Sequence, residues 1–94
     1  MKVFWAAGAV HDRAEIIDHI AQDSPAAAIR MDEVFAESVS RLTQRPFLGK
    51  PGQIPGTREL FPHGSYRLVY EVQENTVWIL ALVHTARMWP PGRR

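Results

Sequence analysis

The first six residues alternate in a way that predicts a β-strand. Val3 and Trp5 fall on one side of an extended chain and Phe4 falls on the other, which is the period of two that a strand requires. Gly8 is expected to end this strand. Its place in a sheet stays open at this stage, because the segment either pairs in parallel with a central strand or lies at an edge.

A helical spacing follows over two consecutive segments. From His11 to about Gln22, apolar residues recur every three or four positions, and the acids between them are expected to face water. Ser24 and Pro25 then signal a helix start, because a serine hydroxyl can cap the first turn and proline suits the first helical position. The second helix is expected to end near Thr43, which predicts an antiparallel helical hairpin. The expected buried positions are Ala14, Ile17 and Ala21, then Ala28, Met31, Phe35, Val39 and Leu42, and the expected exposed acids of the first helix are Asp12, Glu15 and Asp18.

The segment from Pro46 to Gly56 differs in composition from the rest of the chain. It holds three of the seven prolines and three of the six glycines in eleven residues. Because Phe47, Leu48 and Ile54 supply apolar anchors, we expect an ordered loop rather than a flexible linker.

Three short strands are predicted after this loop. The first covers Thr57 to Phe61, a turn at Pro62-His63-Gly64 leads into Ser65 to Val72, and a Glu74-Asn75 turn leads into Thr76 to Val83. The last strand is apolar on both sides, so we expect it inside the sheet. Its two sides are expected to be Val77, Ile79, Ala81 and Val83 against Trp78, Leu80 and Leu82.

The order of these elements predicts an α+β fold, β-α-α-β-β-β, in which an N-terminal strand precedes an antiparallel helical hairpin packed on a small, mostly antiparallel sheet. Ninety-four residues suit a single domain over residues 1–94, and 46% hydrophobic residues argue against disorder. The lack of cysteine excludes disulfides and thiol chemistry. No apolar run approaches the roughly 20 residues that cross a bilayer, so we expect a cytoplasmic protein with no membrane partner.

The net charge of +1 conceals an uneven distribution. Residues 1–45 carry five bases against seven acids, whereas residues 46–94 carry six bases against three acids. The chain ends in a basic tail from His84 to Arg94. An anionic partner is therefore expected to bind the second half.

The residues that could take part in catalysis or binding all lie near the strand ends. The four histidines are dispersed, so no metal site and no cofactor is expected. Guanidinium groups can hold a phosphate, a histidine can move a proton, and a tryptophan can stack on a base. Such a set is sufficient to cut RNA without a metal. The alternative is structural, with the arginines paired to neighbouring acids and the tryptophan capping the core. The set comprises Arg58, Arg67, His84, Arg87 and Trp89.

Three segments resemble the RelE/ParE superfamily of bacterial toxins from toxin–antitoxin modules. They are GTREL at residues 56–60, YRLVY at residues 66–70 and VHTARMWP at residues 83–90. The resemblance covers nearly the whole chain and implies the same fold, a helical hairpin against a small sheet dominated by antiparallel pairs. It also implies a toxin that arrests growth until a cognate antitoxin protein wraps its carboxy-terminal segment around it.

The resemblance implies one of two activities. A RelE-like toxin is a ribosome-dependent, metal-independent mRNA endoribonuclease, with His84, Arg67 and Arg87 as catalytic residues. A ParE-like toxin inhibits DNA gyrase and cleaves nothing, and Arg58, Arg67, Arg87 and Trp89 would then bind the antitoxin or the target. We favour the ParE-like branch, because two lysines and a net charge of +1 are little for binding ribosomal RNA. An interaction module with neither activity is the third alternative.

Overall fold

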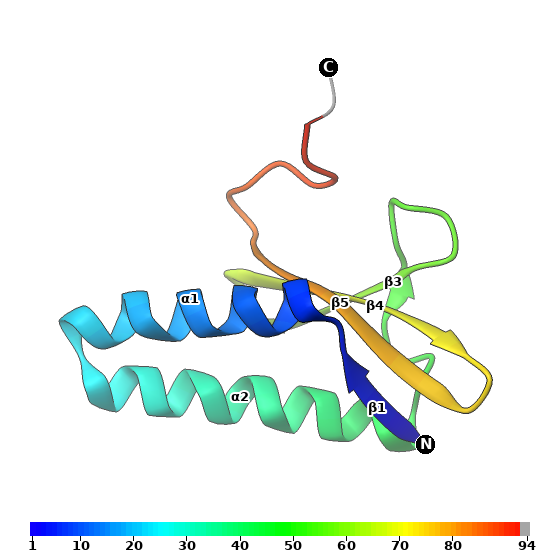
Figure 1. The fold of residues 1–94 in the computed structure, drawn as a ribbon, viewed down its shortest axis with the longest axis horizontal. Coiled ribbons are helices and arrows are strands. Elements are labelled where there is room, and N and C mark those ends of the chain that lie inside the picture. Colours follow the sequence, from blue (N-terminus) through cyan, green and yellow to red (C-terminus); the bar gives the residue numbers. More distant parts are fainter. Residues whose placement is uncertain (93–94) are drawn as a thin grey trace.

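Within residues 1–92, which the computed structural model describes, two helices cover one face of a five-stranded sheet (Figure 1). The expected α+β order is confirmed, and one further strand of two residues lies inside the Pro/Gly-rich loop. In chain order the elements are β1 Lys2–Trp5, α1 Ala7–Asp23, α2 Pro25–Gln44, β2 Lys50–Pro51, β3 Arg58–His63, β4 Tyr66–Gln73 and β5 Thr76–His84.

The sheet has the strand order β1-β5-β4-β3-β2. Strand β1 pairs in parallel with β5 and lies at the edge, so both options left open for it apply together. The other neighbouring pairs are antiparallel. The prediction that the last strand lies inside the sheet is confirmed, because β5 has β1 on one side and β4 on the other.

A β-bulge at Leu80 changes which residues of β5 face the helices. Val69 pairs with Ala81 but Tyr70 pairs with Ile79, so β5 has one extra residue at this point. Ile79 before the bulge and Leu82 after it consequently both enter the core beneath the helices. The strict alternation expected for this strand is therefore wrong beyond Leu80, because one inserted residue exchanges the two faces.

Helix α1 begins four residues earlier than expected. The Ala6 amide still donates to the Ile79 carbonyl of the sheet, but the Ala6 carbonyl already accepts from the amides of Ala9 and Val10 at 2.9 and 3.0 Å. Gly8 therefore lies in the first turn of α1 and does not end the strand. The local reason is the alanine-rich run on both sides of Gly8, since alanine is the best helix former.

The start and the buried stripe of α2 are confirmed. The Ala27 amide donates to the Ser24 hydroxyl at 3.1 Å, and Pro25 is the first helical residue. Four of the five expected stripe positions are buried and Met31 is half-buried. The stripe packs against β4 and β5, so that the core lies between the hairpin and the sheet. The buried stripe residues are Ala28, Phe35, Val39 and Leu42.

The loop between α2 and β3 is ordered, but one expected anchor is wrong. The Tyr70 hydroxyl donates to the Pro46 carbonyl at 2.8 Å and accepts from the Gly49 amide at 2.9 Å. Phe47 was expected to anchor the loop, yet its side chain is 64% exposed. Leu48 instead packs against the core. Polar contacts to a buried tyrosine and the packing of Leu48 thus both hold the loop.

The turn between β3 and β4 lies at Gly64-Ser65, so Pro62 and His63 belong to β3 rather than to the turn. After β5 the tail continues to Gly92, and Arg93 and Arg94 of the expected basic tail lie outside the described residues. Neither helix within residues 1–92 combines the length and the apolar character that a membrane span requires.

Candidate functional site

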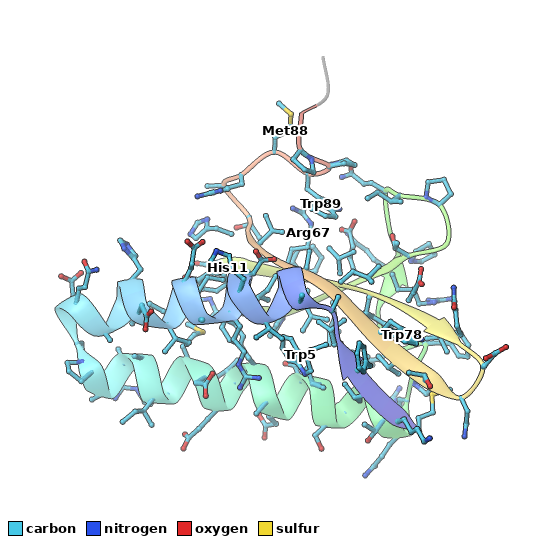
Figure 2. The ribbon with its side chains drawn as sticks, viewed as in Figure 1. Trp5, His11, Arg67, Trp78, Met88 and Trp89 are labelled. Atoms are coloured by element: carbon cyan, nitrogen blue, oxygen red, sulfur yellow. The ribbon has the colours of Figure 1, made fainter. Side chains whose placement is uncertain are left out.

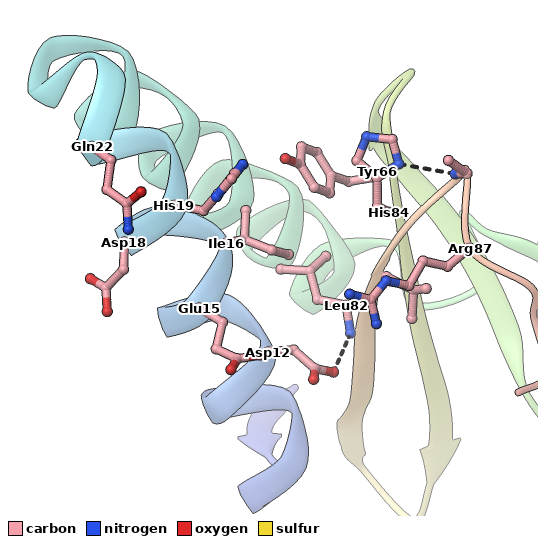
Figure 3. A pocket seen from close by; sticks show the side chains of 12 residues that line it. Asp12, Glu15, Ile16, Asp18, His19, Gln22, Tyr66, Leu82, His84 and Arg87 are labelled. Carbon is pink, nitrogen blue, oxygen red and sulfur yellow. Dashed lines mark hydrogen bonds between the residues drawn. The ribbon is translucent and has the colours of Figure 1, made fainter.

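A groove of about 720 Å³ lies between α1 and the ends of β4 and β5 (Figure 3). Its apolar part is formed by Ile16, Tyr66 and Leu82. Helix α1 contributes a row of carboxylates to one wall, and the chain at the end of β5 contributes cationic or ionisable groups to the other. The carboxylates are Asp12, Glu15 and Asp18, and the opposite wall carries His84 and Arg87.

Asp12 joins the two walls at one end of the groove. Its Oδ2 accepts a hydrogen bond from the Leu82 amide at 3.0 Å (Figure 3). Strand β1 ends at Trp5, whose partner is Ile79, so β5 has no neighbouring strand on this side at Leu82. The expectation that Asp12 faces water is therefore wrong, because its carboxylate satisfies an amide at a sheet edge.

His84 is held at the mouth of the groove by two contacts. Its ring meets Tyr66 edge-on at a centroid distance of 5.3 Å, and its Nδ1 accepts from the Ala86 amide at 3.0 Å. In a neutral imidazole one nitrogen accepts and the other carries the proton. With Nδ1 occupied by this contact, a neutral His84 ring carries its proton on Nε2.

Arg67 lies on the other face of the sheet. Tyr66 contacts Phe35 of α2, so the next residue along β4 points away from the helices. The Arg67 Nε is 3.0 Å from Oε1 of Glu59, which is 3% exposed. The remaining carboxylate oxygen, Oε2, accepts from the Gln53 amide at 3.0 Å. Arg67 thus neutralises a buried carboxylate and is separated from His84 by the sheet.

Arg58 and Trp89 also lie outside the groove. Arg58 donates to the Gly49 carbonyl at 2.6 Å, and its guanidinium lies 4.9 Å from the Phe47 ring centroid. Trp89 is half-buried, and its indole nitrogen is buried without a hydrogen-bond partner in residues 1–92. Figure 2 shows Trp89 in the tail, away from the two helices. Of the five candidates, the structure therefore brings together His84 and Arg87 alone.

The sequence patterns missed several residues of the groove. Glu15 and Asp18 were assigned to a solvated face, and Tyr66 to the apolar side of a strand. Each assignment is locally reasonable, because the groove arises where a helix crosses the end of a sheet, and no spacing within one segment reports that contact. Within residues 1–92, no three histidine or carboxylate side chains are grouped so as to hold a metal ion.

Chemically, the groove combines an apolar floor with walls of opposite charge. Such a surface suits a segment of polypeptide whose apolar side chains enter the groove while its charged side chains meet the walls.

Comparisons with known proteins agree with this fold. The family model described as "ParE toxin of type II toxin-antitoxin system, parDE" matches residues 3–89. Over 90 residues the chain is 32% identical to the Y4kP protein of Sinorhizobium fredii (strain NBRC 101917 / NGR234), covering 95% of this chain and 93% of that protein.

Two solved structures are similar in fold. One is the chromosomal ParDE TA system from P. aeruginosa, with a TM-score of 0.78, 24% identity and coverage of 89% of this chain and 95% of the other. The second is the YoeB/ParE toxin from Agrobacterium tumefaciens, with a TM-score of 0.64, 20% identity and coverage of 89% and 98%. Because the family match extends from β1 to Trp89 of the tail, the chain belongs to the ParE toxin family of type II toxin–antitoxin systems.

Proposed function

We propose that this toxin arrests growth by inhibiting DNA gyrase, without cleaving RNA, and that a cognate antitoxin neutralises it. The observation that carries this choice is the position of Arg67. Metal-free RNA cleavage requires a proton acceptor and cationic groups around one phosphate. Arg67 is paired with Glu59 on one face of the sheet, whereas His84 and Arg87 lie at the groove beside α1.

The charges of the groove support the same choice. A phosphate beside His84 would meet one guanidinium, that of Arg87, in a groove whose α1 wall carries His19 and three carboxylates. Carboxylates repel a phosphate backbone, and RNA affinity depends on neutralising phosphates. The fact that His84 and Arg87 do share a groove favours messenger cleavage as the second candidate function.

Expression from a tightly repressed promoter distinguishes the two candidates. We expect altered plasmid supercoiling, DNA breaks and an SOS response, with translated messages left intact. The variants His84→Ala and Arg87→Ala change exposed side chains and should leave the fold unaffected. If His84→Ala keeps full toxicity, a catalytic histidine is excluded. Rapid loss of translated messages without DNA damage would overturn gyrase inhibition.

The groove is our candidate binding site for the antitoxin. A disordered partner segment that folds on binding would place apolar side chains on Ile16 and Leu82 and an acidic side chain on Arg87. Arg58 is a second candidate contact, on β3 next to the edge strand β2. Antitoxin affinity measured for Arg87→Ala and Arg58→Ala across a salt series tests both, since an ionic contact matters most at low salt. Unchanged binding by a variant would remove that residue from the interface.

A further inference from the structure

The positive charge of this protein is concentrated in one stretch of the chain. Residues 41–67 hold five bases and one acid, a net +4, while the rest of the chain holds six bases and nine acids, a net −3. The stretch runs from the last turn of α2 through the Pro/Gly-rich loop and β3 to the second residue of β4. It is therefore far more basic than the net charge of +1 suggests.

Contacts of the loop bring Arg45, Lys50 and Arg58 to the β2 edge of the sheet. The Leu48 amide donates to the Arg45 carbonyl at 3.0 Å, which places the end of α2 one tight turn from β2. Lys50 of β2 pairs with Glu59 of β3, and Arg58 donates to the Gly49 carbonyl. Because Glu59 is 3% exposed and paired with Arg67, the single acid of the stretch does not offset the surface charge.

Two partly exposed aromatic rings hold cations in this region. The Phe61 ring lies 5.2 Å from the Lys50 ammonium and 5.4 Å from the Arg67 guanidinium, and the Phe47 ring lies 4.9 Å from the Arg58 guanidinium. Stacking on a ring restricts a long side chain before any ligand arrives, which lowers the entropic cost of binding. It also occupies ring faces on which a nucleic acid base would otherwise stack.

We propose that this basic edge binds the phosphate backbone of duplex DNA without reading its sequence. The groups that contact phosphates are the three exposed cations Arg41, Arg45 and Lys50. Arg58 and Arg67 are positioning residues, because the first holds the loop and the second neutralises Glu59. The proposal goes beyond gyrase inhibition, since it assigns the toxin its own contact with DNA.

The surroundings of the three cations favour a duplex over the other polyanions. An acidic peptide needs a cleft for its apolar side chains, and none of the three cations lines the α1–β5 groove or the second cleft, which lies between α1 and α2 beside Trp5. A single strand gains affinity by stacking bases on free aromatic faces, whereas cations already lie against Phe47 and Phe61. Exposed cations can bind the phosphates of a duplex without a cleft or a free aromatic face.

The salt dependence of binding gives the expected magnitude. Each phosphate neutralised contributes about −0.9 to the slope of log K against log salt concentration. Three contacts give a slope of about −2.7, so a fourfold rise in salt weakens binding about 40-fold. The double variant Arg45→Ala/Lys50→Ala should flatten this slope by about 1.8. The weakening of DNA binding by a fourfold rise in salt should then be about 12-fold smaller than for the wild-type chain.

The experiment is fluorescence anisotropy of a labelled DNA duplex titrated with the purified full chain from 50 to 200 mM salt. The matched control is Lys2→Ala/Arg30→Ala, which also removes one exposed lysine and one exposed arginine but leaves the basic edge intact. We expect the control to keep the wild-type slope. Circular dichroism of each variant checks that the fold is unchanged.

Three results would overturn the proposal. The first is an equal flattening in both double variants, which would show a response to net charge alone. The second is tighter binding to a single strand than to the duplex, which would indicate base stacking. The third is binding of an oligoglutamate peptide with no measurable DNA binding, which would make the edge a protein-binding surface.

Discussion

Tyr70 fixes the loop between α2 and β3 through its hydroxyl. The side chain is fully buried, and the hydroxyl donates to the Pro46 carbonyl and accepts from the Gly49 amide. Tyr70→Phe leaves both backbone groups without this partner, so we expect a loss of about 1–3 kcal/mol in the free energy of unfolding. Urea denaturation measures it. A loss below about 0.5 kcal/mol would mean that the loop is held without the hydroxyl.

The same residue makes the stability of the protein decline at alkaline pH. Burial raises the pKa of Tyr70 above its ordinary value of 10.0, although the Gly49 hydrogen bond and Arg58 oppose the rise. The native state then keeps this proton at pH values where the unfolded chain releases it. The resulting stability is fully present below pH 10 and is lost as the pH rises through the native pKa. Tyr70→Phe should flatten the decline of stability above pH 10, and an unchanged decline would contradict this assignment.

Arg67 is bound to Glu59 so closely that its first role is structural. Removing one partner of a buried ion pair leaves an uncompensated charge, so Arg67→Ala should cost about 3–5 kcal/mol. The double variant Glu59→Gln/Arg67→Met leaves no charge and keeps an acceptor for the Gln53 amide. It should recover most of the loss in thermal or urea denaturation. If Arg67→Ala is as stable as the wild-type protein, the structural role of Arg67 is contradicted.

At the scale of the elements, replacing glycine by alanine is expected to have opposite effects on stability at two positions. A Cβ on Gly8 in the first turn of α1 would meet no atom within 4 Å, and alanine is a better helix former. Gly8→Ala should therefore stabilise the protein by roughly 0.5–1 kcal/mol. A Cβ on Gly49 would lie 2.8 Å from the Glu59 carbonyl oxygen and from the Tyr70 hydroxyl oxygen. Gly49→Ala should destabilise it by about 1–3 kcal/mol.

The melting temperatures of these two variants provide the measurement. A higher value for Gly8→Ala and a lower value for Gly49→Ala are expected, and shifts of the same sign would contradict the geometry described for at least one of the two turns.

Local patterns predicted most of the elements, because their causes are local. The Ser24 cap, the stripe through Phe35 and the turn at Glu74-Asn75 each depend on residues a few positions apart. The bulge at Leu80 was missed, since an inserted residue is defined by its pairing with β4 and not by the sequence of β5. The early start of α1 was missed because Gly8 outweighed its alanine neighbours in the prediction.

At the scale of the whole molecule, the candidate site was predicted only in part. His84 and Arg87 were identified and do line one groove, because His84 is the last residue of β5 and Arg87 lies three residues further on. Arg67 was grouped with them because antiparallel strands bring such positions close, but it lies on the opposite face. The carboxylates of the α1 wall come from a distant segment, so their place opposite Arg87 depends on the packing of the hairpin on the sheet.

The most direct test of the central claim is DNA supercoiling by purified gyrase in the presence of the purified chain. With relaxed plasmid and ATP, we predict that the chain inhibits supercoiling, that His84→Ala inhibits equally well, and that the cognate antitoxin restores activity. The same proteins added to programmed ribosomes should leave the message intact. Unaffected gyrase together with a message cut by the wild-type chain but not by His84→Ala would contradict the account.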